Sequence, residues 1–215
     1  MRHPWLVFLS IGVLAIIVFL FFFVRLQPIK TPTKNTLKVI PGSIEKPIVT
    51  FVNPSKGSKN PKVTIVVYSD FACQACQTLA PILDQVLAEF PNQLTIYWKH
   101  LPNEAANPVS TLASIASQCA HQQGKFWLYH DLLFEQQVFL TEDQFSPIAS
   151  QLGLNVPAFE NCYLKQDTLP IIQKDYNEGI GLGLTATPAL YINGQLFVGA
   201  PSSTELIDYV QQIIK

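Results

Sequence analysis

Charged side chains are scarce in this sequence, at 13% of all residues, and neither sign dominates. The 14 Lys and Arg residues nearly balance the 15 Asp and Glu residues, so the formal net charge is −1. A chain without a basic excess has no electrostatic basis for holding a phosphate backbone. We therefore expect no nucleic-acid partner.

The ligands of a metal site are also sparse. Cys73 and Cys76 have the C-x-x-C spacing, but the sequence contains no second such pair and no two histidines at zinc-finger spacing. A structural zinc site needs four ligands. Methionine occurs only as Met1 and no histidine flanks the cysteine pair, which disfavours copper binding. We expect neither a metal nor another cofactor.

A cleavage signal is missing at the end of the N-terminal apolar run. Residues 4–24 carry no charge, and as a helix they would span about 31 Å, close to the thickness of a bilayer core. The run ends in aromatic residues and Arg25, without the small-residue A-x-A pattern of a signal-peptidase site. This predicts an uncleaved transmembrane signal anchor over residues 1–26. A cleaved signal peptide is the alternative.

The charges around this run do not settle its orientation. Arg2 precedes the run, and four basic residues follow it between positions 25 and 38. Read literally, the positive-inside rule places the following domain in the cytoplasm, yet long domains are translocated largely regardless of charge. Residues 27–47 are rich in proline, lysine and threonine without an apolar period, which predicts a tether.

The rest of the chain alternates strand and helix patterns. Residues 62–68 (KVTIVVY) form a continuous apolar stretch rich in β-branched residues, typical of a strand buried on both faces. After the cysteine pair, apolar residues recur at three- and four-residue steps up to Phe90, which predicts a helix, and residues 94–98 form a second strand. These elements together predict a βαβ unit.

Helical periodicity then continues for many residues before strand patterns return. The Asn193-Gly194 dipeptide between two apolar runs predicts a β-hairpin, and residues 203–214 have an amphipathic helical pattern. The fold class is therefore α/β. We expect one domain made of residues 48–102 and 181–215, with residues 103–180 inserted as a helical subdomain.

Cys73 and Cys76 lie directly between the first strand and the helix that follows it. At a helix start, free N–H groups and the helix dipole favour a thiolate. The pKa of a thiol there can fall from about 8.5 to between about 3.5 and 7.5. This predicts a redox pair in which Cys73, the more exposed thiol, is the nucleophile and Cys76 is the resolving thiol.

Three stretches resemble the DsbA-like thiol–disulfide oxidoreductases, which have a thioredoxin fold with a helical insertion. Residues 68–76 (YSDFACQAC) are similar to the entry to their active site, and residues 183–194 (GLTATPALYING) to their cis-proline loop and hairpin. Residues 124–134 resemble part of their helical insertion. The resemblance covers residues 48 to 215.

This resemblance implies a cis peptide bond between Thr187 and Pro188, facing the cysteine pair, where the backbone of a client protein binds. It implies disulfide formation in exported proteins, with cysteine-containing clients and a membrane redox partner that resets the pair. A thiol reductase is the first alternative; a metal-binding or client-holding chaperone is an alternative of another class. We expect a single-pass protein of the cell membrane with its domain on the extracytoplasmic side.

The sequence also departs from the family pattern. The dipeptide between the cysteines is Gln74-Ala75 rather than Pro-His, which removes one source of thiolate stabilisation. Val67 stands where many relatives carry a buried acid for proton transfer. Asp70 and Lys99 are then the nearest candidate charges, either as electrostatic support for the cysteines or as a structural pair.

Cys119 and Cys162 each lie on the apolar face of a predicted helix. Some relatives carry a second disulfide, so we interpret this pair as a structural bridge within the insertion. Two buried thiols are the alternative. A metal site with His121 would need further ligands.

Overall fold

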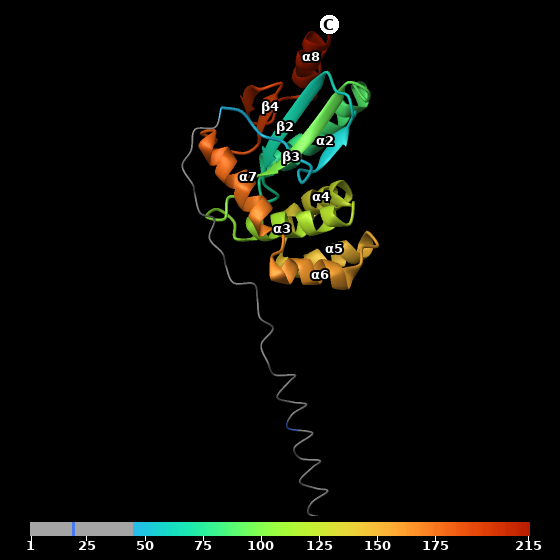
Figure 1. Ribbon diagram of the computed structural model, residues 1–215, viewed down its shortest axis with the longest axis vertical. Coiled ribbons are helices and arrows are strands. Elements are labelled where there is room, and N and C mark those ends of the chain that lie inside the picture. The colour runs from blue at the N-terminus through green and yellow to red at the C-terminus, as the bar shows by residue number, and fades with distance from the viewer. Residues whose placement is uncertain (1–18, 20–44) are drawn as a thin grey trace, which may run out of the picture. The chain divides into compact units, whose positions relative to one another are not determined.

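The structure, a computed structural model, describes Phe19 and residues 45–215 of the chain. Its centre is a five-stranded mixed sheet with the strand order β1-β3-β2-β4-β5 (Figure 1). β2 and β3 are parallel and α2 connects them, which confirms the predicted βαβ unit. The other neighbours in the sheet are antiparallel. The strands are β1 (Ser55–Gly57), β2 (Val63–Ser69), β3 (Leu94–His100), β4 (Ala189–Ile192) and β5 (Gln195–Val198).

Both faces of the sheet are covered by helices. Ile65 and Val67 of β2 belong to a core cluster with residues of α2 (Gln74–Glu89) and α8 (Ser203–Ile214). Val66 and Tyr68 point the other way and pack with residues of α7 (Leu169–Gly181). Successive side chains of a strand alternate between faces, so β2 needs apolar residues at nearly every position.

Helices fill the chain between β3 and β4, as the periodicity predicts. Thr141 and Gln144 form a capping box, and the Asn155 side chain accepts a hydrogen bond from the backbone N–H of Ala158. α3, α4, α5 and α6 pack against one another beside the sheet (Figure 1). The helices are α3 (Val109–Gln122), α4 (Phe126–Glu135), α5 (Phe145–Gln151) and α6 (Val156–Lys165), with short 3-10 turns η1 (Gln137–Phe139) and η2 (Glu142–Gln144).

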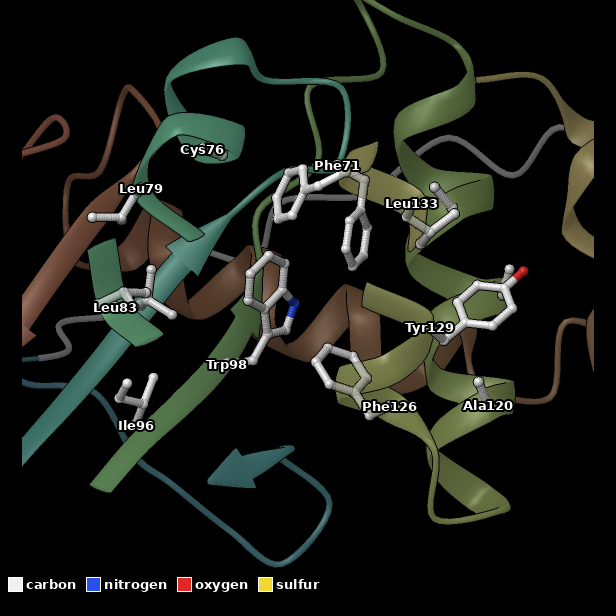
Figure 2. Close-up of a cluster of buried hydrophobic side chains, with 14 of the residues drawn as sticks. Phe71, Cys76, Leu79, Leu83, Ile96, Trp98, Ala120, Phe126, Tyr129 and Leu133 are labelled. Atoms are coloured by element: carbon white, nitrogen blue, oxygen red, sulfur yellow. The ribbon is translucent and has the colours of Figure 1, made fainter. Parts of the chain in front are cut away.

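One hydrophobic core joins this helical group to the sheet. Phe71, from the loop between β2 and α2, stacks on Trp98 of β3 with ring centroids 5.0 Å apart. Trp98 in turn lies against Phe126 of α4, at 5.8 Å. Figure 2 shows these rings between Leu79 and Ile96 on the sheet side and the insertion helices on the other. The position of the loop before α2 is therefore tied to the packing of the insertion.

A disulfide bridge links α3 to α6. Cys119 and Cys162 are bonded, with their Cα atoms 5.9 Å apart and 43 residues of separation in sequence. Both are buried, at 1% and 5% exposure. The expected structural bridge is thus present, and the two cysteines are not separate buried thiols.

The predicted anchor and most of the tether lie, apart from Phe19, outside the described residues. Among the residues that are described, no helix combines the length and the apolar composition needed to cross a membrane.

We predict that replacing both Cys119 and Cys162 with alanine lowers the free energy of unfolding by about 2–4 kcal/mol, because the unfolded chain regains the freedom of a long loop. Denaturant titration without reductant, in a background where Cys73 and Cys76 are both replaced with serine, would measure this. Each single alanine variant should lose nearly as much as the double variant, because either change breaks the cross-link. Strictly additive losses would contradict a bridge in solution.

Candidate active site

Cys73 is the N-cap residue of α2. Its Sγ accepts a hydrogen bond from the backbone N–H of Cys76 at 3.2 Å. The Cys73 side chain is half-buried, whereas Cys76, one turn into the helix, is only 1% exposed. The two thiols are free in this structure. One sulfur is therefore accessible to a reaction partner and the other is shielded behind it, as the sequence predicts.

The two thiols differ strongly in acidity. A hydrogen bond from the Cys76 side chain, helped by the Cys76 backbone N–H, lowers the pKa of Cys73 to about 6. Burial, together with the neighbouring Cys73 sulfur, raises the pKa of Cys76. Near neutral pH the accessible sulfur is therefore a thiolate and the buried one a thiol. The Cys76 S–H group is then available as a donor to the thiolate.

The peptide bond between Thr187 and Pro188 is cis and lies against the nucleophile. The Cys73 Sγ lies 3.4 Å from the Thr187 carbonyl oxygen and donates to it when the thiol is protonated. Beside this loop lies a pocket of about 200 Å³, whose lining includes Leu101, Ile180 and Leu184 as well as Thr187. The β4 strand follows immediately after Pro188, so the loop is held by the sheet.

Asp70 holds the turn that precedes Cys73. Its buried carboxylate accepts from the backbone N–H groups of Ala72 and Asn103, both at 2.9 Å, and from the Ser110 hydroxyl at 3.0 Å. Burial raises the pKa of this carboxyl group, and its hydrogen bonds oppose that rise. The charge of Asp70 raises the pKa of Cys73. Asp70 is therefore placed as a structural anchor, and electrostatically it opposes the thiolate.

Lys99 does not pair with Asp70. Its Nζ lies 3.0 Å from both Asp175 Oδ1 and Glu178 Oε1, and all three side chains are buried. Tyr68 donates a further hydrogen bond to Glu178. This cluster joins β2 and β3 to α7, on the sheet face away from α2. The two acids are three residues apart on one helix, a spacing that puts them on the same face, so a search for partners of Lys99 could have found them.

Two glutamines that sequence analysis did not single out link the start of α2 and the turn before it to the helical insertion. Gln137 of η1 donates its side-chain amide to the carbonyl oxygens of Phe71, at 2.8 Å, and Cys73, at 3.0 Å. Gln77 of α2 donates to the carbonyl oxygen of Phe134 at 2.6 Å. Nothing in the spacing of Gln137, 64 residues beyond Cys73, marks it in the sequence.

The remaining candidates take structural positions. Val67 is buried in β2, in register with Trp98. His121 stacks edge-on against Phe126, while the Cys119 sulfur that it was considered with is in the disulfide. Within the described part of the chain, no group of three or more His, Cys, Asp or Glu residues is arranged to hold a metal ion.

Several solved structures share this architecture. The oxidised BdbD protein of Bacillus subtilis superposes with a TM-score of 0.72 at 18% identity, covering 81% of this chain and 99% of that one. The thiol-disulfide exchange protein alpha-DsbA2 of Wolbachia pipientis gives 0.69 at 19% identity, covering 76% of this chain and 88% of that one. At these identities the likeness establishes the fold.

Curated relatives match a similar part of the chain. The Na(+)/H(+) antiporter NhaA of Herminiimonas arsenicoxydans is 27% identical over 161 residues, which are 75% of this chain and 25% of that protein. NhaA 1 of Mycolicibacterium gilvum is 30% identical over 154 residues, which are 71% of this chain and 25% of that protein. The chain thus spans about a quarter of the length of these relatives.

The pattern that describes the thioredoxin family matches residues 52–212. That region contains the βαβ unit, the cysteine pair at the start of α2, the helices after β3 and the cis-proline hairpin. With most of its length matched and its fold shared, this chain belongs to the thioredoxin family.

Proposed function

We propose that this protein is a thiol–disulfide oxidoreductase that forms disulfides in exported proteins through Cys73 and Cys76. The observation that carries the proposal is the pairing of an accessible thiol of lowered pKa with a buried thiol of raised pKa at one helix start. Such a pair separates the two tasks of exchange. The accessible Cys73 sulfur forms the mixed disulfide with the client, and the buried Cys76 sulfur forms the intramolecular disulfide with Cys73.

The exchange has two steps when the protein begins as the Cys73–Cys76 disulfide. A client thiolate attacks the Cys73 sulfur, a mixed disulfide forms, and the Cys76 thiolate leaves and takes up a proton. A second client thiolate then attacks the client sulfur of the mixed disulfide, and Cys73 leaves as a thiolate. The client loses two electrons and two protons, and the cysteine pair is reduced.

The acidity of Cys73 favours this direction over reduction. A pKa of about 6 stabilises the thiolate, and therefore the reduced protein, relative to its disulfide. It also makes Cys73 a good leaving group in the second step. The Cys76 S–H and N–H groups supply this stabilisation, so the missing Pro-His dipeptide is compensated in part by the pair itself.

The surroundings of Cys73 suit a polypeptide substrate. The cis Thr187–Pro188 loop offers a carbonyl beside the reacting sulfur, and we propose that an extended client segment lies along it. Val138 and Phe139, which follow Gln137, are each 78% exposed. We propose that these exposed apolar side chains contact apolar residues of clients that are still unfolded.

We also propose that the domain works outside the cytoplasm, held at the cell membrane by residues 1–26. The internal disulfide of α3 and α6 supports an oxidising compartment. A protein fixed at the membrane meets a membrane redox partner at high effective concentration. That partner would reoxidise the Cys73–Cys76 pair after each turnover.

Substituting the cysteines tests the assigned roles. Cys73→Ser should abolish oxidation of a dithiol peptide, because no nucleophile or attacked sulfur remains. Cys76→Ser should accumulate mixed disulfides when its Cys73 thiolate attacks a client disulfide and expels one client thiolate, since no Cys76 thiol remains to attack Cys73 and release the client. Non-reducing gel electrophoresis and mass spectrometry would detect the adducts. Full activity in either variant contradicts the proposal.

The pH dependence of alkylation tests the electrostatics. In the reduced protein the rate of Cys73 alkylation should rise with a midpoint at about pH 6. The thiolate would then make up about 90% of the population at pH 7. Cys73→Ser should remove this fast phase and leave the buried Cys76 slow. A midpoint near 8.5, the ordinary value, would contradict the site geometry.

A reporter fusion tests the location. Alkaline phosphatase fused after Lys215 should be active in cells, because that enzyme needs an oxidising compartment for its own disulfides. A cytoplasmic reporter at the same position should be inactive. The reverse pattern would place the domain in the cytoplasm.

A further inference from the structure

The turn that carries Cys73 is held from two sides. On one side, Asp70 accepts from the Ala72 N–H within the turn and, through its other oxygen, from Asn103 and Ser110. On the other side, the Gln137 amide donates to two carbonyl oxygens of the turn. Backbone donors and acceptors of one short segment are therefore both fixed by side chains.

The Gln137 contacts lie at the base of the nucleophile itself. The Cys73 carbonyl oxygen also accepts from the backbone N–H groups of Cys76 and Gln77, each at 3.1 Å. It is therefore the point where the first turn of α2 and the insertion meet. The Gln137 Nε2 atom donates to this oxygen and to the Phe71 carbonyl oxygen, so it bridges the two residues on either side of Ala72.

A second amide makes the connection reciprocal. Gln77 of α2 donates to the Phe134 carbonyl oxygen in the last turn of α4, three residues before Gln137. The helix that carries the cysteines thus holds the insertion, and the insertion holds the turn before that helix. Hydrogen bonds in both directions fix η1 and the start of α2 relative to each other.

We propose that Gln137 is a positioning residue for Cys73, through which the helical insertion sets the reactivity of the nucleophile. This inference rests on the proposed function and deepens it. Gln137 fixes the Cys73 backbone so that Sγ stays in line with the Cys76 N–H, at 3.2 Å. Release of the Cys73 carbonyl lets the turn move, and this N–H···S bond weakens. The thiolate then loses part of its stabilisation.

Gln137 acts on the sulfur only through the backbone, because its side-chain amide donates to carbonyl oxygens. A loss of fold stability alone would not change the acidity of Cys73 in molecules that remain folded. The acidity of Cys73 in the folded protein therefore separates positioning from a general structural role.

The test uses the reduced, full-length protein and three variants. Gln137→Glu keeps the shape of the side chain but replaces the donor with a carboxylate. Gln137→Met removes the donor without adding charge. Gln136→Glu is the matched control, since it adds the same charge one residue earlier, at the C-cap of α4, and leaves the Gln137 amide intact.

The pKa of Cys73 is followed by ultraviolet absorbance of the thiolate, and the folded fraction by circular dichroism. Gln137→Met should raise the pKa by about half a unit to one unit, which below the pKa lowers the thiolate fraction about three- to tenfold. Gln137→Glu should raise it at least as much, and Gln136→Glu less than either. The alkylation rate at a fixed pH near 5, below the pKa of Cys73, should fall in parallel.

Three results would overturn the inference. They are an unchanged pKa in the folded Gln137→Met variant, an equal shift in Gln136→Glu and Gln137→Glu, or a fall in pKa. Should Gln137→Glu not fold, Gln137→Met and Gln136→Glu decide alone. If the parent protein shows no fast thiol and no exchange, the proposed function fails first. If the parent exchanges normally and the Gln137 variants match it, only the positioning role fails.

Discussion

The site depends on two donors of Cys76 to the Cys73 sulfur, first its S–H group and, beside it, the hydrogen bond from its backbone N–H. The backbone hydrogen bond exists because Cys73 occupies the N-cap of α2, where backbone N–H groups have no partner within the helix. A sulfur in that place is stabilised as a thiolate without any neighbouring cation. Every other feature of the site either maintains this position or gives a client access to it.

The helical insertion maintains the position by packing and by hydrogen bonds. Phe71 is fully buried and lies in ring contact with Trp98, Phe134 and His130. Two of these residues belong to α4 and one to β3, so the loop before Cys73 cannot move without disturbing both. Rings at such distances also contribute beyond the area they bury. The helical insertion therefore packs directly against the active-site loop and helps to fix its position.

Local patterns in the sequence are sufficient to predict most elements of the fold. The continuous apolar run of β2, the Asn193-Gly194 turn and the capping box at Thr141 each encode their structure within a few residues. β1 was not predicted, because a three-residue edge strand has no period to recognise. The predicted anchor at residues 1–26 remains a prediction.

The cysteine pair was recognisable for the same local reason, since both thiols lie on one helix start. The groups that surround it come from distant parts of the chain. Asp70 meets Asn103 and Ser110, and Lys99 meets the acids of α7, more than 70 residues away. Such partners depend on how the helices pack, which a single sequence does not encode in any short pattern. The nearest charges in sequence were therefore a poor guide to the charges in contact.

The choice of an acid on one side of the turn and an amide on the other follows from electrostatics. Asp70 must be an acceptor, because it faces N–H and O–H donors, and its charge raises the pKa of Cys73. Gln137 must be a donor, because it faces two carbonyl oxygens. A neutral amide meets this need without adding a second negative charge beside the thiolate, whereas a glutamate would repel both the carbonyl oxygens and the sulfur. Asp70 and Gln137 therefore hold the turn from two sides, and of these two side chains only Asp70 opposes the thiolate.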